Sequence, residues 1–181
     1  MNSRVGDILV SMISNSLHDT PDLRTAQSRL DELGTARSTA AVAERADLLR
    51  VLGRLDEALA TAEESYRLAF FTGDREDVTA ARLRRARVLQ DKGSLDRALT
   101  EVKACNLAAH TEAWGELEAS ALYQLASVLV DLRRLEEARS TISELVKLRA
   151  SQGAPPEQLT ALDEALETIM RRMLTEPASG S

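Results

Sequence analysis

The chain is poor in the residues on which several protein classes depend. Its 181 residues include one cysteine, and only 3% of them are aromatic. A single cysteine excludes an intramolecular disulfide, and the sequence has no cluster of cysteine and histidine that would bind zinc. The eight glycines, four prolines and few aromatic residues disfavour a β-sandwich or a β-barrel. Alanine, leucine, arginine and glutamate are abundant instead, which favours helix.

Long apolar runs and an excess of positive charge are also missing. No apolar run approaches the roughly 20 residues that a membrane-spanning helix needs. The short apolar stretch at residues 8–10 follows Asp7 and would make a poor signal peptide. The net charge of −6 disfavours the coating of nucleic acid. We therefore expect a cytoplasmic protein that binds neither membranes nor nucleic acid.

The common catalytic motifs do not occur in the sequence. It contains no glycine-rich phosphate loop, no HExxH zinc motif and no GxSxG nucleophile motif. His18 and His110 are far apart, and Cys105 falls on a buried type of helical position with no neighbouring base. We therefore expect a protein that is not an enzyme and that has no catalytic residue, no metal site and no cofactor.

A repeat with a spacing of 40 residues dominates what is present. Residues 53–59, GRLDEAL, recur as residues 93–99, GSLDRAL, and more weakly as residues 133–139, RRLEEAR. Small residues upstream keep the same spacing at Ala46, Ala86 and Ala126. The spacing predicts three consecutive copies, over residues 38–77, 78–117 and 118–157.

Each copy has a helical period that is interrupted once. In the first copy, apolar residues recur at helical spacing from Val42 to Leu52, and again from Leu55 onward. Gly53 and Gly93 stand where the first helix would end on a left-handed residue, and Arg133 occupies this place in the third copy at some conformational cost. The pattern predicts a hairpin of two helices in each copy. Neighbouring hairpins must stack, because each alone leaves an apolar face uncovered.

The flanking segments depart from this register. Residues 4–17 suggest an amphipathic helix, and Thr20-Pro21-Asp22 resembles the N-terminus of a second one, so we interpret residues 1–37 as a degenerate helical hairpin. Residues 158–174 predict a C-terminal helix that either caps the array or forms a homodimer. Residues 175–181 are expected to be a disordered tail. Phe70 and Phe71 stand at the end of a predicted helix, and we expect at least one of them in the core. Trp114 stands in a loop between two copies, where it either anchors the loop by packing or contacts a partner.

These residues resemble the tetratricopeptide repeat family. The pattern from Leu49 to Ala58 is similar to the family signature, and the alanines at 46, 86 and 126 match its small position in the first helix. The repeat is longer than the usual length of about 34 residues and resembles the variants found in kinesin light chains and bacterial peptide-sensing regulators. Arg45 and Arg85 stand where the family usually has leucine. The resemblance implies an all-α fold, a right-handed α-solenoid of antiparallel helix hairpins.

The resemblance also implies a concave groove lined by the first helix of each copy. The middle copy is net basic in an acidic chain, and guanidinium groups suit the capture of carboxylates. We therefore expect the partner to be a protein or a peptide, and an acidic peptide would suit these arginines. The groove positions carried over from the family are Arg50, Arg84, Arg87, Gln90, Tyr123, Gln124 and Ser127.

Two alternatives remain open at this point. If equal positions of neighbouring first helices face each other, Glu44 would pair with Arg84 and Asp47 with Arg87, as surface ion pairs worth about 0–1 kcal/mol each. The leading function is an interaction scaffold that binds a partner segment in the groove. The alternatives are a peptide-sensing regulator or secretion-type chaperone, and a structural module that oligomerises through its terminal helices.

Overall fold

The computed structural model describes residues 22–175, and every regular element in this range is an α-helix. The helices are α2 (Leu23–Leu33), α3 (Thr39–Val51), α4 (Leu55–Thr72), α5 (Arg75–Asp91), α6 (Leu95–Thr111), α7 (Gly115–Asp131), α8 (Leu135–Ser151) and α9 (Pro156–Thr175). The predicted all-α class is confirmed. The helix predicted at residues 4–17 lies outside the described residues, as do residues 176–181 of the predicted tail. The first residue of that predicted tail, Thr175, is instead the last residue of α9.

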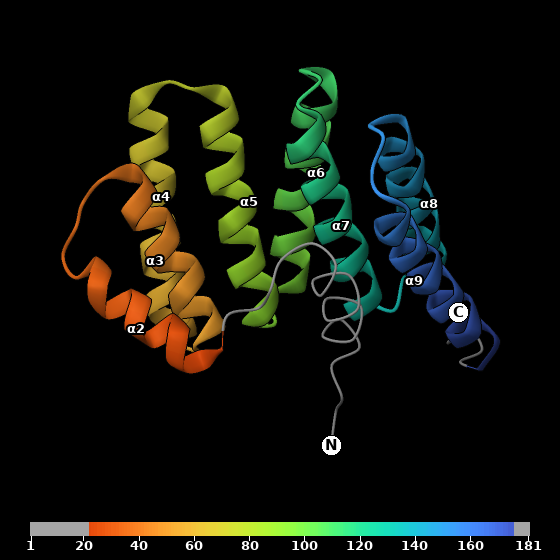
Figure 1. Cartoon of the computed structure of the whole chain (residues 1–181), viewed down its shortest axis with the longest axis horizontal. Helices are drawn as coiled ribbons and strands as arrows, with labels where there is room; N and C mark the ends of the chain where they lie inside the picture. Colours follow the sequence, from red (N-terminus) through yellow and green to blue (C-terminus); the bar gives the residue numbers. More distant parts are fainter. Residues whose placement is uncertain (1–21, 176–181) are drawn as a thin grey trace. The chain divides into compact units, whose positions relative to one another are not determined.

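The chain forms two compact units that divide between Leu117 and Glu118. In the unit that ends at Leu117, each helix from α2 to α6 packs against the next one in sequence, and α3 also packs against α5. Figure 1 shows α3 to α6 running alternately up and down. In the other unit, α9 packs against α8. This succession of hairpins is the predicted architecture.

The three hairpins close with the same left-handed turn. The backbone φ is +73° at Gly53, +79° at Gly93 and +61° at Arg133. The next residue in each turn donates its N–H to a carbonyl five residues earlier, with N···O distances of 2.9, 2.9 and 2.8 Å. These bonds satisfy carbonyls that the end of a helix leaves without partners. The prediction for Arg133 is confirmed: a residue with a Cβ makes the turn, at a cost of about 1–2 kcal/mol.

The breaks between hairpins also contain left-handed residues. These are Gly73, Ala113 and Gly153, with φ of +79°, +56° and +74°. The second break covers residues 112–114, with Ala113 as its left-handed residue, and Gly115 is already the first residue of α7. Trp114 is half-buried, and its backbone N–H donates a hydrogen bond to the carbonyl of Ala109 at 2.9 Å.

Small residues allow the paired helices to approach each other closely. Ala58, Ala98 and Ala138, which stand at equal positions at the start of α4, α6 and α8, are each 0% exposed. A core cluster of the first unit draws on α3, α4 and α5, with Leu30 of α2 packed against it; its members are Ala46, Leu49, Ala58, Ala62 and Val88. The side chains that fill the core are thus supplied by the repeat positions that recur in the sequence.

The start of α2 differs from the prediction. The helix begins at Leu23 with Asp22 as its N-cap, two residues later than the predicted cap at Thr20. Asp22 is extended at ψ 139°, and its carbonyl accepts the first helical hydrogen bond from the N–H of Ala26 at 2.9 Å. Its side chain makes no capping bond.

The expectation for the two phenylalanines is wrong. Phe70 is 66% exposed and Phe71 is 86% exposed. The buried position in the last turn of α4 belongs to Ala69, just as Ala109 takes the equal place in α6. The two aromatic rings follow that buried position in the last turn of the helix and remain exposed.

Candidate binding face on the first helices

Two ion pairs cross between the neighbouring first helices α3 and α5. The Nε of Arg84 donates to Oδ2 of Asp47 at 2.9 Å, and Nη1 of Arg50 donates to Oδ2 of Asp91 at 3.1 Å. The four side chains are between 22% and 40% exposed. We call the surface that carries them the α3–α5 face. Its charges are partly compensated within the protein, since each helix supplies one acid and one base.

The pairing predicted from equal repeat positions is wrong in detail. Asp47 pairs with Arg84, one helical turn before the predicted Arg87. Glu44 accepts two hydrogen bonds from Arg29 of α2, at 2.6 and 3.1 Å, and neither predicted pair forms among the described residues. Side chains of facing helices interdigitate, so a residue on one helix lies between two residues of the other that are a turn apart. The repeat spacing alone does not decide between these two partners.

The bond from Arg29 to Glu44 also has an electrostatic effect. Hydrogen bonding to the Arg29 guanidinium holds the pKa of the Glu44 carboxyl below its usual range. The carboxylate therefore stays ionised well into acid solution. This pair ties α2 to α3 at the edge of the α3–α5 face.

Arg84 retains unused hydrogen-bonding capacity. Only its Nε is engaged with the rest of the described chain, through Asp47, so both Nη groups keep donors available. The side chain is 22% exposed. Arg87 and Gln90, which were also predicted for the groove, are half-buried on the same helix. A carboxylate that approached this surface would find a guanidinium already oriented by its first partner.

Four of the seven predicted groove residues lie in the unit that ends at Leu117. Arg50, Arg84, Arg87 and Gln90 lie on α3 and α5, which pack against each other. The other three, Tyr123, Gln124 and Ser127, lie on α7 in the other unit. The side chain of Tyr123 is half-buried, whereas Gln124 and Ser127 are only 6% and 3% exposed. Polar residues on a helix are usually exposed, so the burial of Gln124 and Ser127 could not be predicted from their residue types.

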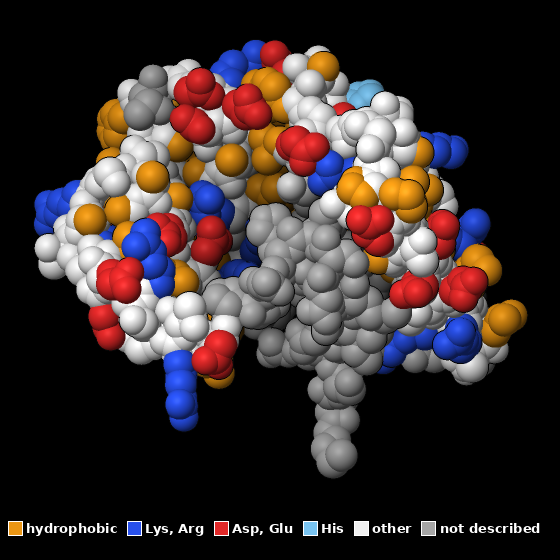
Figure 2. Space-filling view, viewed as in Figure 1, with side chains coloured by type: hydrophobic (Ala, Val, Ile, Leu, Met, Phe, Trp, Pro, Cys, Tyr) orange, Lys and Arg blue, Asp and Glu red, His pale blue; other side chains and the backbone are white. Residues whose placement is uncertain are grey.

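Charged side chains of both signs are interspersed over the part of the surface formed by α2 and α3 (Figure 2). No single sign of charge dominates there. This mixture is consistent with the ion pairs described above. Long-range attraction of a charged partner would therefore be weak, and recognition on this face would depend on close contacts.

Arg85, where the family usually has leucine, is a connecting residue that the sequence did not reveal. Its Nε and Nη2 donate to the two carboxylate oxygens of Glu101 at 2.9 and 2.8 Å. Its guanidinium carbon also lies 4.5 Å from the ring centroid of Tyr66. One side chain of α5 thus contacts both α4 and α6. The bidentate pair and the cation–π contact replace the packing that a leucine would supply.

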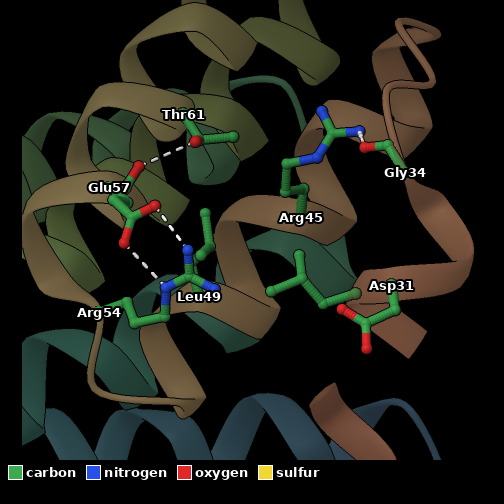
Figure 3. Close-up of a pocket in the computed structure, with 8 residues that line it drawn as sticks. Asp31, Gly34, Arg45, Leu49, Arg54, Glu57 and Thr61 are labelled. Carbon is green, nitrogen blue, oxygen red and sulfur yellow. Dashed lines mark hydrogen bonds and ion pairs between the residues drawn. The ribbon is translucent and has the colours of Figure 1, made fainter. Parts of the chain in front are cut away.

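A hollow of about 450 Å³ opens beside α2, α3 and α4 (Figure 3). Arg45 reaches across it and donates from Nη2 to the carbonyls of Gly34 and Ala36 at 2.7 and 2.9 Å. Arg54 donates to both oxygens of Glu57 and lowers the pKa of that carboxyl. The polar groups at this hollow therefore serve internal contacts. Arg45, the second departure from the family pattern, fixes the loop between α2 and α3.

The described ranges contain no group of histidine, cysteine and carboxylate side chains that would hold a metal ion, and none of their helices is long and apolar enough to cross a bilayer. Cys105 is 1% exposed, and burial raises the pKa of its thiol to about 12. A thiol with so high a pKa is a poor nucleophile at neutral pH.

Hairpins of paired helices that recur at a fixed spacing, each closed by the same left-handed turn, define a helical-repeat protein. Residues 119–152 match the family model described as tetratricopeptide repeat. The match falls in the third predicted copy, so this part of the chain is similar in sequence to a tetratricopeptide repeat. Repeats of this family generally mediate interactions between proteins.

Two solved structures show the same fold over nearly the whole chain. They are crystal structures of nearly identical TPR-like repeats of a kinesin light chain-like protein from Podosopora anserina, one of them a point variant. They are 16% identical to this chain, with TM-scores of 0.60 and 0.61, and the alignments cover 96% of this chain and 95% of each of those chains. No curated protein sequence matches the chain. The likeness confirms the predicted TPR-like fold of helix hairpins.

Proposed function

We propose that this protein is a non-enzymatic interaction scaffold that binds a partner peptide or protein segment on the α3–α5 face. The observation that carries the proposal is the state of Arg84. Its guanidinium is held by Asp47 through one nitrogen, it is partly exposed, and its remaining donors are unused by the described chain. Arg87 lies one turn further along the same helix.

A partner segment with aspartate or glutamate residues fits this face. A carboxylate would accept from the Nη groups of Arg84 without displacing Asp47, since the guanidinium has five donors in a planar fork. A hydrogen bond between charged groups contributes about 1.5–3 kcal/mol, which corresponds to at least a tenfold change in affinity. The rest of the binding energy would come from apolar contacts of the segment.

Immobilised peptides test this proposal. One set of 12-residue peptides is rich in aspartate and glutamate, and a matched set has asparagine and glutamine at the same positions. The wild-type protein is expected to bind members of the acidic set preferentially. Arg84→Gln is expected to weaken that binding at least tenfold, because it removes the charged donors while keeping a side chain of similar size.

Arg54→Gln provides the matched control. It removes one arginine from an exposed pair with Glu57, away from the α3–α5 face, and changes the net charge equally. It should leave peptide binding unchanged. The proposal is contradicted if both variants lose binding equally, or if the wild-type protein does not distinguish the two peptide sets. Circular dichroism of both variants checks that the helices are intact.

A further inference from the structure

Helix α9 has one buried side and one partly apolar side that the described chain does not cover. Its buried residues are Ala161, Leu162, Ala165 and Ile169, and the helix packs against α8. Met170 is nevertheless 47% exposed and Leu174 is 87% exposed. With the half-buried Leu166 they follow a spacing of four residues, which places all three on one stripe of the helix.

The charges on α9 are divided along its length. The acidic residues Asp163, Glu164 and Glu167 precede Met170, and the basic residues Arg171 and Arg172 follow it. None of these five side chains forms an ion pair with a described residue. Figure 2 shows hydrophobic, acidic and basic side chains together on the surface formed by α9. The helix thus presents unpaired charges of opposite sign on the two sides of an exposed apolar residue.

We propose that two copies of the chain associate through α9, with the two helices antiparallel and crossing near Met170. An antiparallel pair places the acidic half of each helix beside the basic half of the other. Leu166 of one copy then faces Leu174 of the other, and the two Met170 side chains meet at the two-fold axis. Arg171 lies within reach of Glu167 of the second copy, because the two positions are offset by only about 3 Å along the axis.

The arrangement of charges selects this orientation and this partner. In a parallel pair, Glu167 would face Glu167 and Arg171 would face Arg171, which is unfavourable on both counts. A two-fold interface uses the same patch on both copies, so the patch must be complementary to itself. The α9 stripe meets this condition because its acidic and basic ends are related by reversal.

The size of the surface sets the strength of the association. A helix of 20 residues is about 30 Å long, and one pair of crossing helices covers less than the roughly 800 Å² per partner of a standard interface. The dimer is therefore weak and depends on protein concentration. Its exposed charge pairs are screened by salt, so the association falls as ionic strength rises.

Sedimentation equilibrium of the full chain tests the inference. The protein is measured from about 10 µM to about 1 mM, the range in which small interfaces associate. At low salt the mass should rise from 19.8 kDa toward twice that value as concentration increases. Glu167→Arg should raise the dissociation constant at least about tenfold, because it turns two symmetric attractions into repulsions. Met170→Lys should have the same effect by placing like charges at the crossing point.

A charge exchange between copies makes the test specific. Glu167→Arg and Arg171→Glu should each be monomeric alone, whereas an equimolar mixture of the two should form heterodimers. The double variant that carries both changes should dimerise like the wild type. Glu144→Arg on α8 makes the same change in net charge at another exposed residue and should leave dimerisation unaffected.

Three outcomes would overturn the inference. The first is a wild-type protein that stays monomeric throughout the concentration range, and the second is a dimer that persists in Glu167→Arg and Met170→Lys. The third outcome is a mixture of the two charge variants that does not associate. None of these results depends on the α3–α5 face, so each experiment tests either this inference or the proposed function, and not both.

Discussion

The bidentate pair of Arg85 and Glu101 gives the most informative stability prediction. Arg85 on α5 and Glu101 on α6 have side chains that are only 19% and 14% exposed, and their two bonds are 2.9 and 2.8 Å long. The perturbation is a double-mutant cycle in which each residue is replaced by leucine, singly and together. Leucine is the residue that the family usually has at position 85, so the replacement suits the site.

The expected magnitudes follow from burial. Removing one partner of a fully buried ion pair costs about 3–5 kcal/mol, because the other charge is left uncompensated. Some water still reaches this pair, so we expect Arg85→Leu to cost about 2–3 kcal/mol, including about 0.5–1 kcal/mol from the contact with Tyr66. Glu101→Leu should cost less, since Arg85 keeps its place over the Tyr66 ring. The double variant should recover to within about 1 kcal/mol of the wild type.

Urea unfolding followed by circular dichroism measures the four proteins. The coupling free energy between the two positions should be about 2 kcal/mol. The exposed pair of Arg54 and Glu57, with side chains 43% and 57% exposed, is the control and should show a coupling of about 0.2–1 kcal/mol. Equal coupling in the two cycles would refute the reasoning, because burial would then not govern the strength of the pairs. So would a double variant as unstable as the sum of the single ones.

Three further predictions concern other parts of the fold. Ala98→Leu should lower the free energy of unfolding by about 1–3 kcal/mol in a urea titration, because Ala98 is 0% exposed where two helices cross; an unchanged midpoint would mean that the site has unused space. Glu44 has a lowered pKa in the folded protein, so its pair with Arg29 stabilises above the pKa of the unfolded chain, and this contribution is lost as the pH falls through the folded value. Amide exchange in α2 should accordingly rise in acid relative to the other helices, and Glu44→Gln should already show the faster exchange at pH 7. The Cys105 thiol, whose pKa is raised to about 12, should resist alkylation at pH 8 in the native protein and react on addition of urea; immediate labelling of the native protein would show that its helix is not packed as described.

Sequence predicted the features of the fold that are local and periodic. The hairpin turns at Gly53, Gly93 and Arg133 follow from a left-handed residue at a fixed place in a helical pattern, and the structure has all three. The buried alanines at 58 and 98 follow from the same pattern. These features depend on interactions within a few residues of each other, which the order of the residues records directly.

Side-chain partners across helices were less predictable. The repeat spacing placed Asp47 opposite Arg87, but a shift of one turn gives it Arg84 instead. Arg85 departs from the leucine that is usual in the family, and its role depends on contacts with Tyr66 and Glu101, which lie on two other helices. Exposure at the ends of helices was also misjudged, as Phe71 shows. Each of these outcomes is decided by the packing of helices against one another rather than by period.

The neighbour-to-neighbour packing of α2 to α6 has a consequence for how this part of the chain folds. Because each helix contacts partners that are at most two helices away in sequence, the contact order is low and little loop-closure entropy must be overcome. Folding of this type is fast and does not wait for distant segments to meet. During synthesis, the helices α3 and α4 can pack against each other before α5 leaves the ribosome, and the hairpin of α5 and α6 then adds to a surface that is already formed.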